Sequence, residues 1–193
     1  MNVRKGWQQR RSPLINAPDR AAYGDLVAAV PAPHTGVELG ALVGLLTGPG
    51  KRIGTVAVGH SRDAPSRAAA EAFTVAWEAR GGTVLAVVDW PESAASWLRP
   101  AVRLTETAPD AWAVAAAPLG FAQLARRLRH STDWDPARTY AFAALGDHRL
   151  PALAGDGTLH GLRGATADGG TWEVHHDAVT GLPPAANAPG QHT

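Results

Sequence analysis

The chain has 193 residues, which at roughly 100 to 200 residues per domain corresponds to one domain, with or without tails. Hydrophobic residues make up 45% and charged residues 18%, a balance that excludes disorder over most of the length. The net charge of +1 argues against nucleic acid or an anionic membrane as the partner, and the absence of cysteine excludes disulfides and thiolate chemistry.

Residues 1–34 are polar, rich in proline and weakly periodic, and they predict an irregular N-terminal arm. Its cationic start, which includes Arg4, Arg10 and Arg11, resembles the first part of an export signal, but no apolar core follows. No run of about 18 apolar residues occurs anywhere in the sequence. We therefore expect no membrane insertion and a cytoplasmic location.

The next elements alternate between helix and strand. Thr35 to Leu46 is dense in apolar residues and predicts a helix buried on much of its circumference. Arg52 to Val58 is a short apolar run typical of a strand covered on both faces. After the turn at Gly59, either Ser61 or Asp63 can cap a helix that ends near Gly81.

The same unit recurs along the rest of the chain. Further strands are predicted at Thr83 to Val88, Ala111 to Ala117, Thr139 to Leu145 and Leu159 to Ala167, with a candidate edge strand at 171–179. Helices are predicted between them, at Ser96 to Thr107, directly after Ala117 and at Asp147 to Leu153. The alternation predicts an α/β fold: a doubly wound, mostly parallel five-stranded sheet in a three-layer α/β/α single lobe over residues 35–179. Residues 180–193 are predicted to form a disordered tail.

Ligands of doubly wound sheets bind outside the carboxyl ends of the strands, so the residues there are the candidates for a binding site. They offer acids, an arginine, a hydroxyl, imidazoles and an indole, which together suit a small zwitterionic or polar ligand. The candidate ligand-binding residues are His60, Ser61, Arg62, Asp63, Trp90, Asp147 and His148. Each also has a structural interpretation: the serine and the two aspartates as helix caps, the tryptophan as an aromatic plug, and the histidines as surface residues.

Two other motifs are weaker. Gly48 to Arg52 looks like a phosphate-binding loop, but it precedes a strand, and Arg52 occupies the position of the magnesium-binding Ser or Thr. His160, His175 and His176 raise the question of a metal, yet neighbouring residues of a strand point to opposite sides. We expect no metal and no cofactor.

One enzymatic alternative stays open. Gly59 to Asp63 resembles the nucleophile elbow G-x-S-x-G, with Ser61 as nucleophile and Asp147 with His160 or His175 as later triad partners. Against a serine hydrolase, Asp63 replaces the second glycine of the motif. No upstream strand is predicted that could supply the second oxyanion donor.

Residues 51–166 resemble the second lobe of type I periplasmic binding proteins, the Leu/Ile/Val-binding receptor family. The matching stretches are Gly50 to Val56, Ala68 to Val88, Leu104 to Ala115, Gly120 to Leu128 and Leu159 to Ala165. The resemblance implies a flavodoxin-like lobe whose strand-end loops form one wall of an amino-acid cleft, with Asp147 placed to meet an ammonium group. The chain departs from the family because Ala64 and Pro65 stand where an aromatic is common, and because the first lobe and an export signal are missing.

A single wall buries only part of a ligand, which weakens binding. We therefore expect a non-enzymatic module that binds an amino-acid-like small molecule or a partner, completed by a homodimer or by a partner protein that supplies the second lobe.

Overall fold

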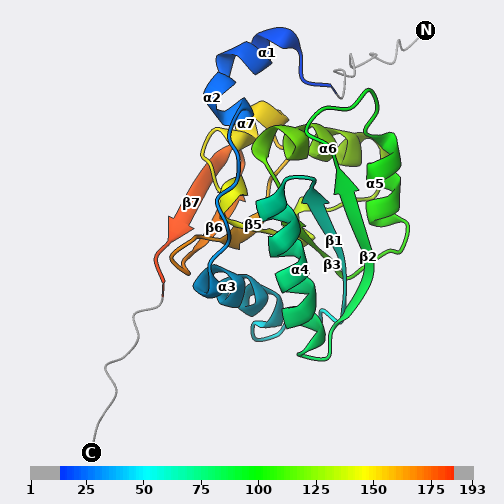
Figure 1. Cartoon of the computed structure of the whole chain (residues 1–193), viewed down its shortest axis with the longest axis vertical. Coiled ribbons are helices and arrows are strands. Elements are labelled where there is room, and N and C mark those ends of the chain that lie inside the picture. The colour runs from blue at the N-terminus through cyan, green and yellow to red at the C-terminus, as the bar shows by residue number, and fades with distance from the viewer. Residues whose placement is uncertain (1–13, 185–193) are drawn as a thin grey trace, which may run out of the picture.

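The computed structural model describes residues 14–184, and a seven-stranded sheet forms its centre (Figure 1). The strands are β1 (Thr55–Ser61), β2 (Thr83–Trp90), β3 (Ala111–Ala115), β4 (Thr139–Ala141), β5 (Arg163–Ala165), β6 (Thr171–His175) and β7 (Ala178–Leu182). Their order is β2-β1-β3-β4-β5-β6-β7, in which the first five are parallel and the last two antiparallel. The predicted α/β class with a mostly parallel sheet is confirmed, but the number of strands is seven rather than five.

Helices cover both faces of this sheet, which makes three layers (Figure 1). One face carries α3 (Gly36–Thr47) and α4 (Ala64–Glu78), and the other carries α5 (Leu98–Thr105), α6 (Pro118–Ser131) and α7 (Leu150–Ala154). The strands alternate accordingly: Val56 and Val58 belong to the core under α3 and α4, whereas Ala57 belongs to the core under α5 and α6. Each face therefore has its own buried cluster.

Strand β1 is the point where the winding reverses. Helix α4 connects β1 to β2 on one side, and α5 crosses the opposite face to reach β3 on the other side of β1. Connections that diverge in this way leave a crevice outside the carboxyl ends of the two strands, here at Ser61 and Ala115. The fold thus places any ligand site where the predicted candidates begin.

The pairing of β1 with β2 contains a register shift. Val56 faces Val84, but the next residue, Ala57, faces Ala86, so that Leu85 has no partner opposite it. This extra residue bends β2, which is the outermost strand on its side of the sheet.

The N-terminal arm differs from its prediction. Residues 14–34 contain two short helices, α1 (Ala17–Ala22) and α2 (Gly24–Val27), and Leu26 is buried in the core beneath α6. The Asp25 carboxylate lies 2.5 Å from the Arg149 guanidinium, which adds an ion pair between the arm and the lobe. The arm is docked rather than irregular throughout.

The other end of the lobe also differs, since β7 continues the sheet to Leu182, beyond the predicted boundary at 179. The cationic residues of 1–13 and the predicted tail from 185 onward lie outside the described residues. Within 14–184, no helix combines the length and hydropathy needed to cross a bilayer.

Several predicted strands are shorter than the apolar runs suggested. Strand β4 ends at Ala141, and the 3-10 helix Ala143–Leu145 takes the place of its expected second half. A second 3-10 helix, Pro136–Arg138, precedes β4, and β5 begins only at Arg163. The shortening places Phe142 and Ala143 just beyond the end of β4, where Phe142 caps the 3-10 helix that Ala143 begins.

We predict that Gly164→Ala strongly destabilises the protein. A Cβ at this position in β5 would lie 2.0 Å from the carbonyl oxygen of Ala141 in β4 and 2.5 Å from the Trp172 ring. Overpacking of this kind costs about 1 to 3 kcal/mol of the free energy of unfolding, or more where backbone must move. Gly40→Ala is the matched control, since nothing lies within 4 Å of its Cβ in α3, and it should gain about 0.5 to 1 kcal/mol. Urea denaturation measures both, and a Gly164→Ala protein as stable as wild type would contradict the close packing of β4 and β5.

Candidate functional site

The predicted ligand residues do not gather around one cavity. Ser61 and Asp63 are engaged in the crevice between β1 and β3, Trp90 is in the core, His60 and Arg62 line a groove beside β2, and Asp147 and His148 line a hollow near β6. The sheet brings the strand ends to one side of the molecule, but the side chains point to separate places.

Ser61 joins the elements that meet in the crevice. Its side chain is fully buried, and its Oγ donates to Asp63 Oδ2 at 2.5 Å and accepts from the backbone N–H of Ala117 at 2.9 Å. Asp63 in turn caps α4 by accepting from the N–H of Ser66 at 2.8 Å, as its structural interpretation predicted. Burial raises the pKa of Asp63, but the hydrogen bonds from Ser61 and Ser66 outweigh it and hold that pKa below the ordinary value.

This geometry gives the hydrolase alternative no support. Among the described residues, no histidine bonds to Ser61 Oγ: the Nδ1 of His60 lies 2.9 Å from the carbonyl oxygen of Ser61 and makes no bond to its hydroxyl. Catalysis by Ser61 stays a prediction that no comparison tests.

Trp90 lies at the end of β2 with no exposed surface. Its ring packs on Gly59, where a Cβ would come within 2.7 Å of the indole carbons. In this structure Trp90 lies over the end of β1 in the core that includes Leu104 of α5, as an aromatic plug does.

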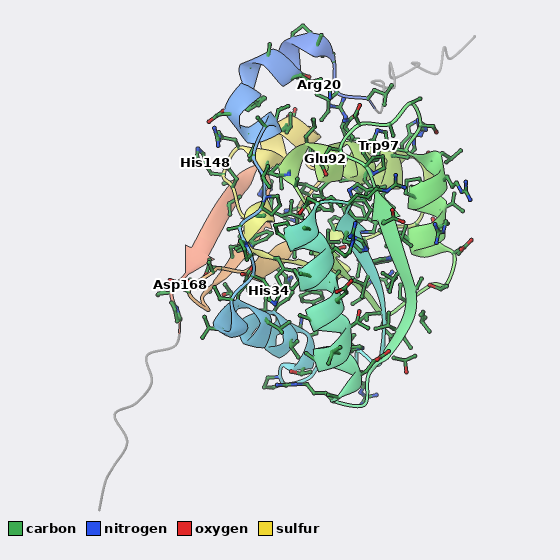
Figure 2. All side chains as sticks on the ribbon, viewed as in Figure 1. Arg20, His34, Glu92, Trp97, His148 and Asp168 are labelled. Carbon is green, nitrogen blue, oxygen red and sulfur yellow. The ribbon has the colours of Figure 1, made fainter. Side chains whose placement is uncertain are left out.

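Asp147 already has a cationic partner. Arg149 donates from Nε to Oδ1 at 3.0 Å and from Nη2 to Oδ2 at 2.8 Å, and these bonds keep the pKa of Asp147 below its ordinary value. The neighbouring His148 side chain is exposed, on the side of the molecule near β7 (Figure 2). An ammonium group would have to compete with a bidentate arginine for Asp147.

His60 and Arg62 line a groove of about 500 Å³ between α4 and the outermost strand β2. Arg62 pairs there with Asp89, Nε to Oδ2 at 2.5 Å, and both side chains are solvent-exposed. A solvated ion pair of this kind contributes little binding energy.

The three histidines considered for a metal do lie together, contrary to the expectation from strand alternation. The rings of His160 and His176 are 5.2 Å apart, and His160 Nδ1 accepts the backbone N–H of His176. His176 has a φ of 55° in the turn between β6 and β7, which breaks the alternation. Even so, the described part of the chain contains no cluster of three or more ligand-type side chains that could hold a metal ion.

A cavity of about 250 Å³ lies at the carboxyl ends of β3 and β4, beneath residues 31–34 of the arm. Residues of the arm, the N-terminal turns of α3 and α4 and the strand ends line it: Pro31, Ala32, Pro33, His34, Glu38, Pro65, Ser66, Ala69, Ala115, Ala116, Phe142, Ala143, Ala144 and Ala167. Sites for drug-sized ligands start at about 300 Å³, so this volume suits a ligand no larger than an amino acid. A wider hollow of about 730 Å³ between α1, α6 and α7 is lined by no residue of a described strand.

One carboxylate lines the cavity. Glu38 is only 3% exposed, and its Oε1 accepts the N–H of Ala143 at 2.6 Å while its Oε2 accepts the N–H of Thr35 at 3.2 Å. Thr35 also donates from Oγ1 to the carbonyl oxygen of Ala167 at 2.7 Å, so the start of α3 is tied to the ends of both β4 and β5. The ring of His34 meets that of Phe142 edge-on, with centroids 5.9 Å apart, beside the start of α3 (Figure 2).

Sequence reasoning missed Glu38 as a site residue. The available signal was the spacing Thr35-x-x-Glu38 before an apolar run, which is the pattern of a capping box. That pattern predicts a helix start, and it does not reveal that the carboxylate faces a cavity.

Glu92 was missed as well. It follows β2, and its Oε2 accepts the N–H of Gly120 in the first turn of α6 at 2.8 Å, while its Oε1 is buried with no hydrogen-bond partner in the described structure. Burial raises the pKa of Glu92 above its ordinary value, and the nearby charge of Asp63 adds to the rise. Figure 2 shows Glu92 beside the upper end of β2, apart from His148 and His34.

Comparison with solved structures confirms the predicted resemblance in fold. A substrate-binding periplasmic protein from Ralstonia solanacearum superposes with a TM-score of 0.58 at 17% identity, over 74% of this chain and 40% of that one. An extracellular ligand-binding receptor from Rhodopseudomonas palustris HaA2 superposes with a TM-score of 0.56 at 19% identity, over 67% of this chain and 34% of that one. A protein from Rhodospirillum rubrum described as a branched-chain amino acid ABC transporter has a TM-score of 0.56 and 23% identity, over 65% of this chain and 35% of that one.

These values define the class of the fold and no more. The chain is an α/β lobe of the kind found in periplasmic substrate-binding proteins, and it spans between a third and two fifths of the length of those structures. No family model and no curated protein matches the sequence.

We predict that Glu92→Gln makes the protein more stable than wild type at pH 7. Because its pKa is raised on folding, the protonated form of Glu92 is favoured in the folded state, so wild type loses stability as pH rises from about its ordinary value of 4.5 through the raised one. Glutamine keeps an acceptor for Gly120 and carries no charge at any pH. Thermal unfolding at pH 4 and pH 7 measures the difference, which should be larger at pH 7, and an unchanged difference would contradict the buried charge.

Proposed function

We propose that this chain is a non-enzymatic binding module that holds a small molecule in the cavity between its strand ends and residues 31–34 of its own arm. The observation that carries the proposal is the position of that cavity. It adjoins the crevice at the carboxyl ends of the parallel strands, which is where doubly wound sheets bind ligands.

The lining supports small-molecule binding rather than catalysis. Apolar side chains from the arm, α4 and the strand ends surround a single buried carboxylate, and this combination of an apolar wall with few polar groups is typical of ligand sites. The structural neighbours in Ralstonia solanacearum and Rhodopseudomonas palustris are described as substrate-binding and ligand-binding proteins, which favours the same class of function. Amino-acid size fits the volume.

In this proposal, part of the wall that covers the ligand comes from the chain itself. A lone lobe was expected to need a second copy or a partner, because one wall leaves much of a ligand in water. Residues 31–34 lie over the strand ends and provide part of that wall within the chain. A homodimer or a partner lobe stays a prediction, and it is not required for the cavity to bind.

Titration calorimetry of the purified chain with aliphatic compounds of amino-acid size tests the proposal. Ala69 is a buried residue of α4 that lines the cavity, and Ala69→Leu should fill it and weaken binding at least about tenfold, equivalent to 1.4 kcal/mol. Ala68→Leu on the exposed face of the same helix is the control and should leave the dissociation constant unchanged.

Stability supplies an independent readout. A ligand at 100 times its dissociation constant adds about 2.7 kcal/mol to the free energy of unfolding. Failure of every compound to bind and to raise the melting temperature, or equal binding by the Ala69→Leu and wild-type proteins, would exclude this cavity as the site.

A further inference from the structure

We propose that the cavity selects organic cations, namely small aliphatic ammonium ions that carry no carboxylate, and that Glu38 is the residue that selects them. The inference rests on the proposed function and names the ligand class of the same cavity.

The charge of Glu38 has no partner of opposite sign in the described structure. Its side chain is 3% exposed, and no lysine, arginine or histidine nitrogen of residues 14–184 forms a salt bridge with it. The two N–H groups that it binds occupy two of about four lone-pair positions of a carboxylate. A buried charge is costly unless it is paired, so a ligand cation would remove an existing cost.

The helix cap does not explain why this residue is charged. A glutamine at the same position could complete the capping box, but its single oxygen could not serve Thr35 and Ala143 from separate atoms, as the two carboxylate oxygens do. The first turn of α3 favours a negative charge, but that effect is typically worth less than about 1 kcal/mol. The two backbone bonds therefore explain why two acceptor oxygens stand here, and they leave the negative charge without a cation among residues 14–184.

The remaining walls suit the apolar part of an alkylammonium ion. Ala69, Ala115 and the prolines 31 and 33 are apolar, and Phe142 offers an aromatic ring, whose face attracts cations. Neither lysine nor arginine lines the cavity, and the N–H of Ser66 in the first turn of α4 already bonds to Asp63. The carboxylate of a free amino acid would thus meet no permanent cation here: the imidazole of His34, which contacts Phe142, is the one basic side chain of the lining, and the carboxylate would lie close to Glu38.

Three probes with the same isopentyl group distinguish the contributions of the ammonium charge, the apolar chain and a carboxylate to binding by the full-length wild-type protein. Isopentylammonium carries the cation, isopentyl alcohol is its neutral counterpart, and leucine adds a carboxylate. Because a hydrogen bond to a charged group contributes about 1.5 to 3 kcal/mol, we expect the ammonium ion to bind at least about tenfold more tightly than either the alcohol or leucine.

The variant Glu38→Gln should remove this preference. Affinity for isopentylammonium should fall by about tenfold or more, to the level of the alcohol, while affinity for the alcohol changes little. Glu71→Gln, at an exposed acid of α4 outside the cavity, is the matched control and should change neither affinity. Circular dichroism and the melting temperature establish that each variant is folded, and the comparison of the three probes in wild type needs no variant.

Each outcome decides a different statement. Equal binding of the ammonium ion and the alcohol overturns the selection by charge and leaves the proposed cavity function standing. Tighter binding of leucine than of the ammonium ion overturns the exclusion of carboxylates. Binding of none of the three probes overturns both this inference and the proposed function.

Discussion

The hydroxyl group of Ser61 is the constraint on which the arrangement of the strand ends depends. It lies where β1 ends, and it bonds to the residue that caps α4 and to the backbone of the residue that precedes α6. The end of β1 and the starts of two helices, which pack on opposite faces of the sheet, are held by one buried oxygen. Since a buried hydroxyl without partners is costly, the contacts support one another, and the crevice between β1 and β3 is fixed before any ligand enters.

The carboxylate of Glu38 holds the other side of the cavity. Glu38 bonds to Thr35 at the start of α3 and to Ala143 beyond β4, while Thr35 reaches Ala167 beyond β5. The segment that covers the cavity is therefore anchored at the point where it enters α3. In the proposed site one side chain would serve both structure and recognition, because the carboxylate that these bonds position also lines a mostly apolar cavity.

Much of the fold could be predicted because its signals are local. Short apolar runs between helical segments specify a parallel sheet, since consecutive parallel strands need crossover connections. The hairpin of β6 and β7 was predicted only as one edge strand, because its turn at His176 and Asp177 lacks the glycine-containing pairs that mark tight hairpins. Helices α1 and α2 have six and four residues, too few for a periodic pattern, and they depend on docking against the lobe.

The candidate site was harder to predict for a related reason. The sequence indicates which residues follow a strand. It does not indicate whether their side chains already have partners within the protein, such as the helix N-terminus that Asp63 caps or the arginine that pairs with Asp147. The cavity wall formed by residues 31–34 depends on contacts across the chain, and no local pattern marks it. The structural interpretation as a helix cap is correct for Asp63 but not for Ser61, whose hydroxyl bonds to Asp63 and to the N–H of Ala117.

The unopposed Leu85 in β2 has a consequence for how molecules of this protein meet one another. β2 is an outermost strand with half-exposed Leu85 and Val87, and a straight strand of that kind would offer its free backbone groups to a second molecule. The one-residue slip against β1 bends the strand and interrupts the regular spacing that intermolecular pairing requires. Deletion of Leu85 would straighten this edge and expose the protein to aggregation through continuous sheets.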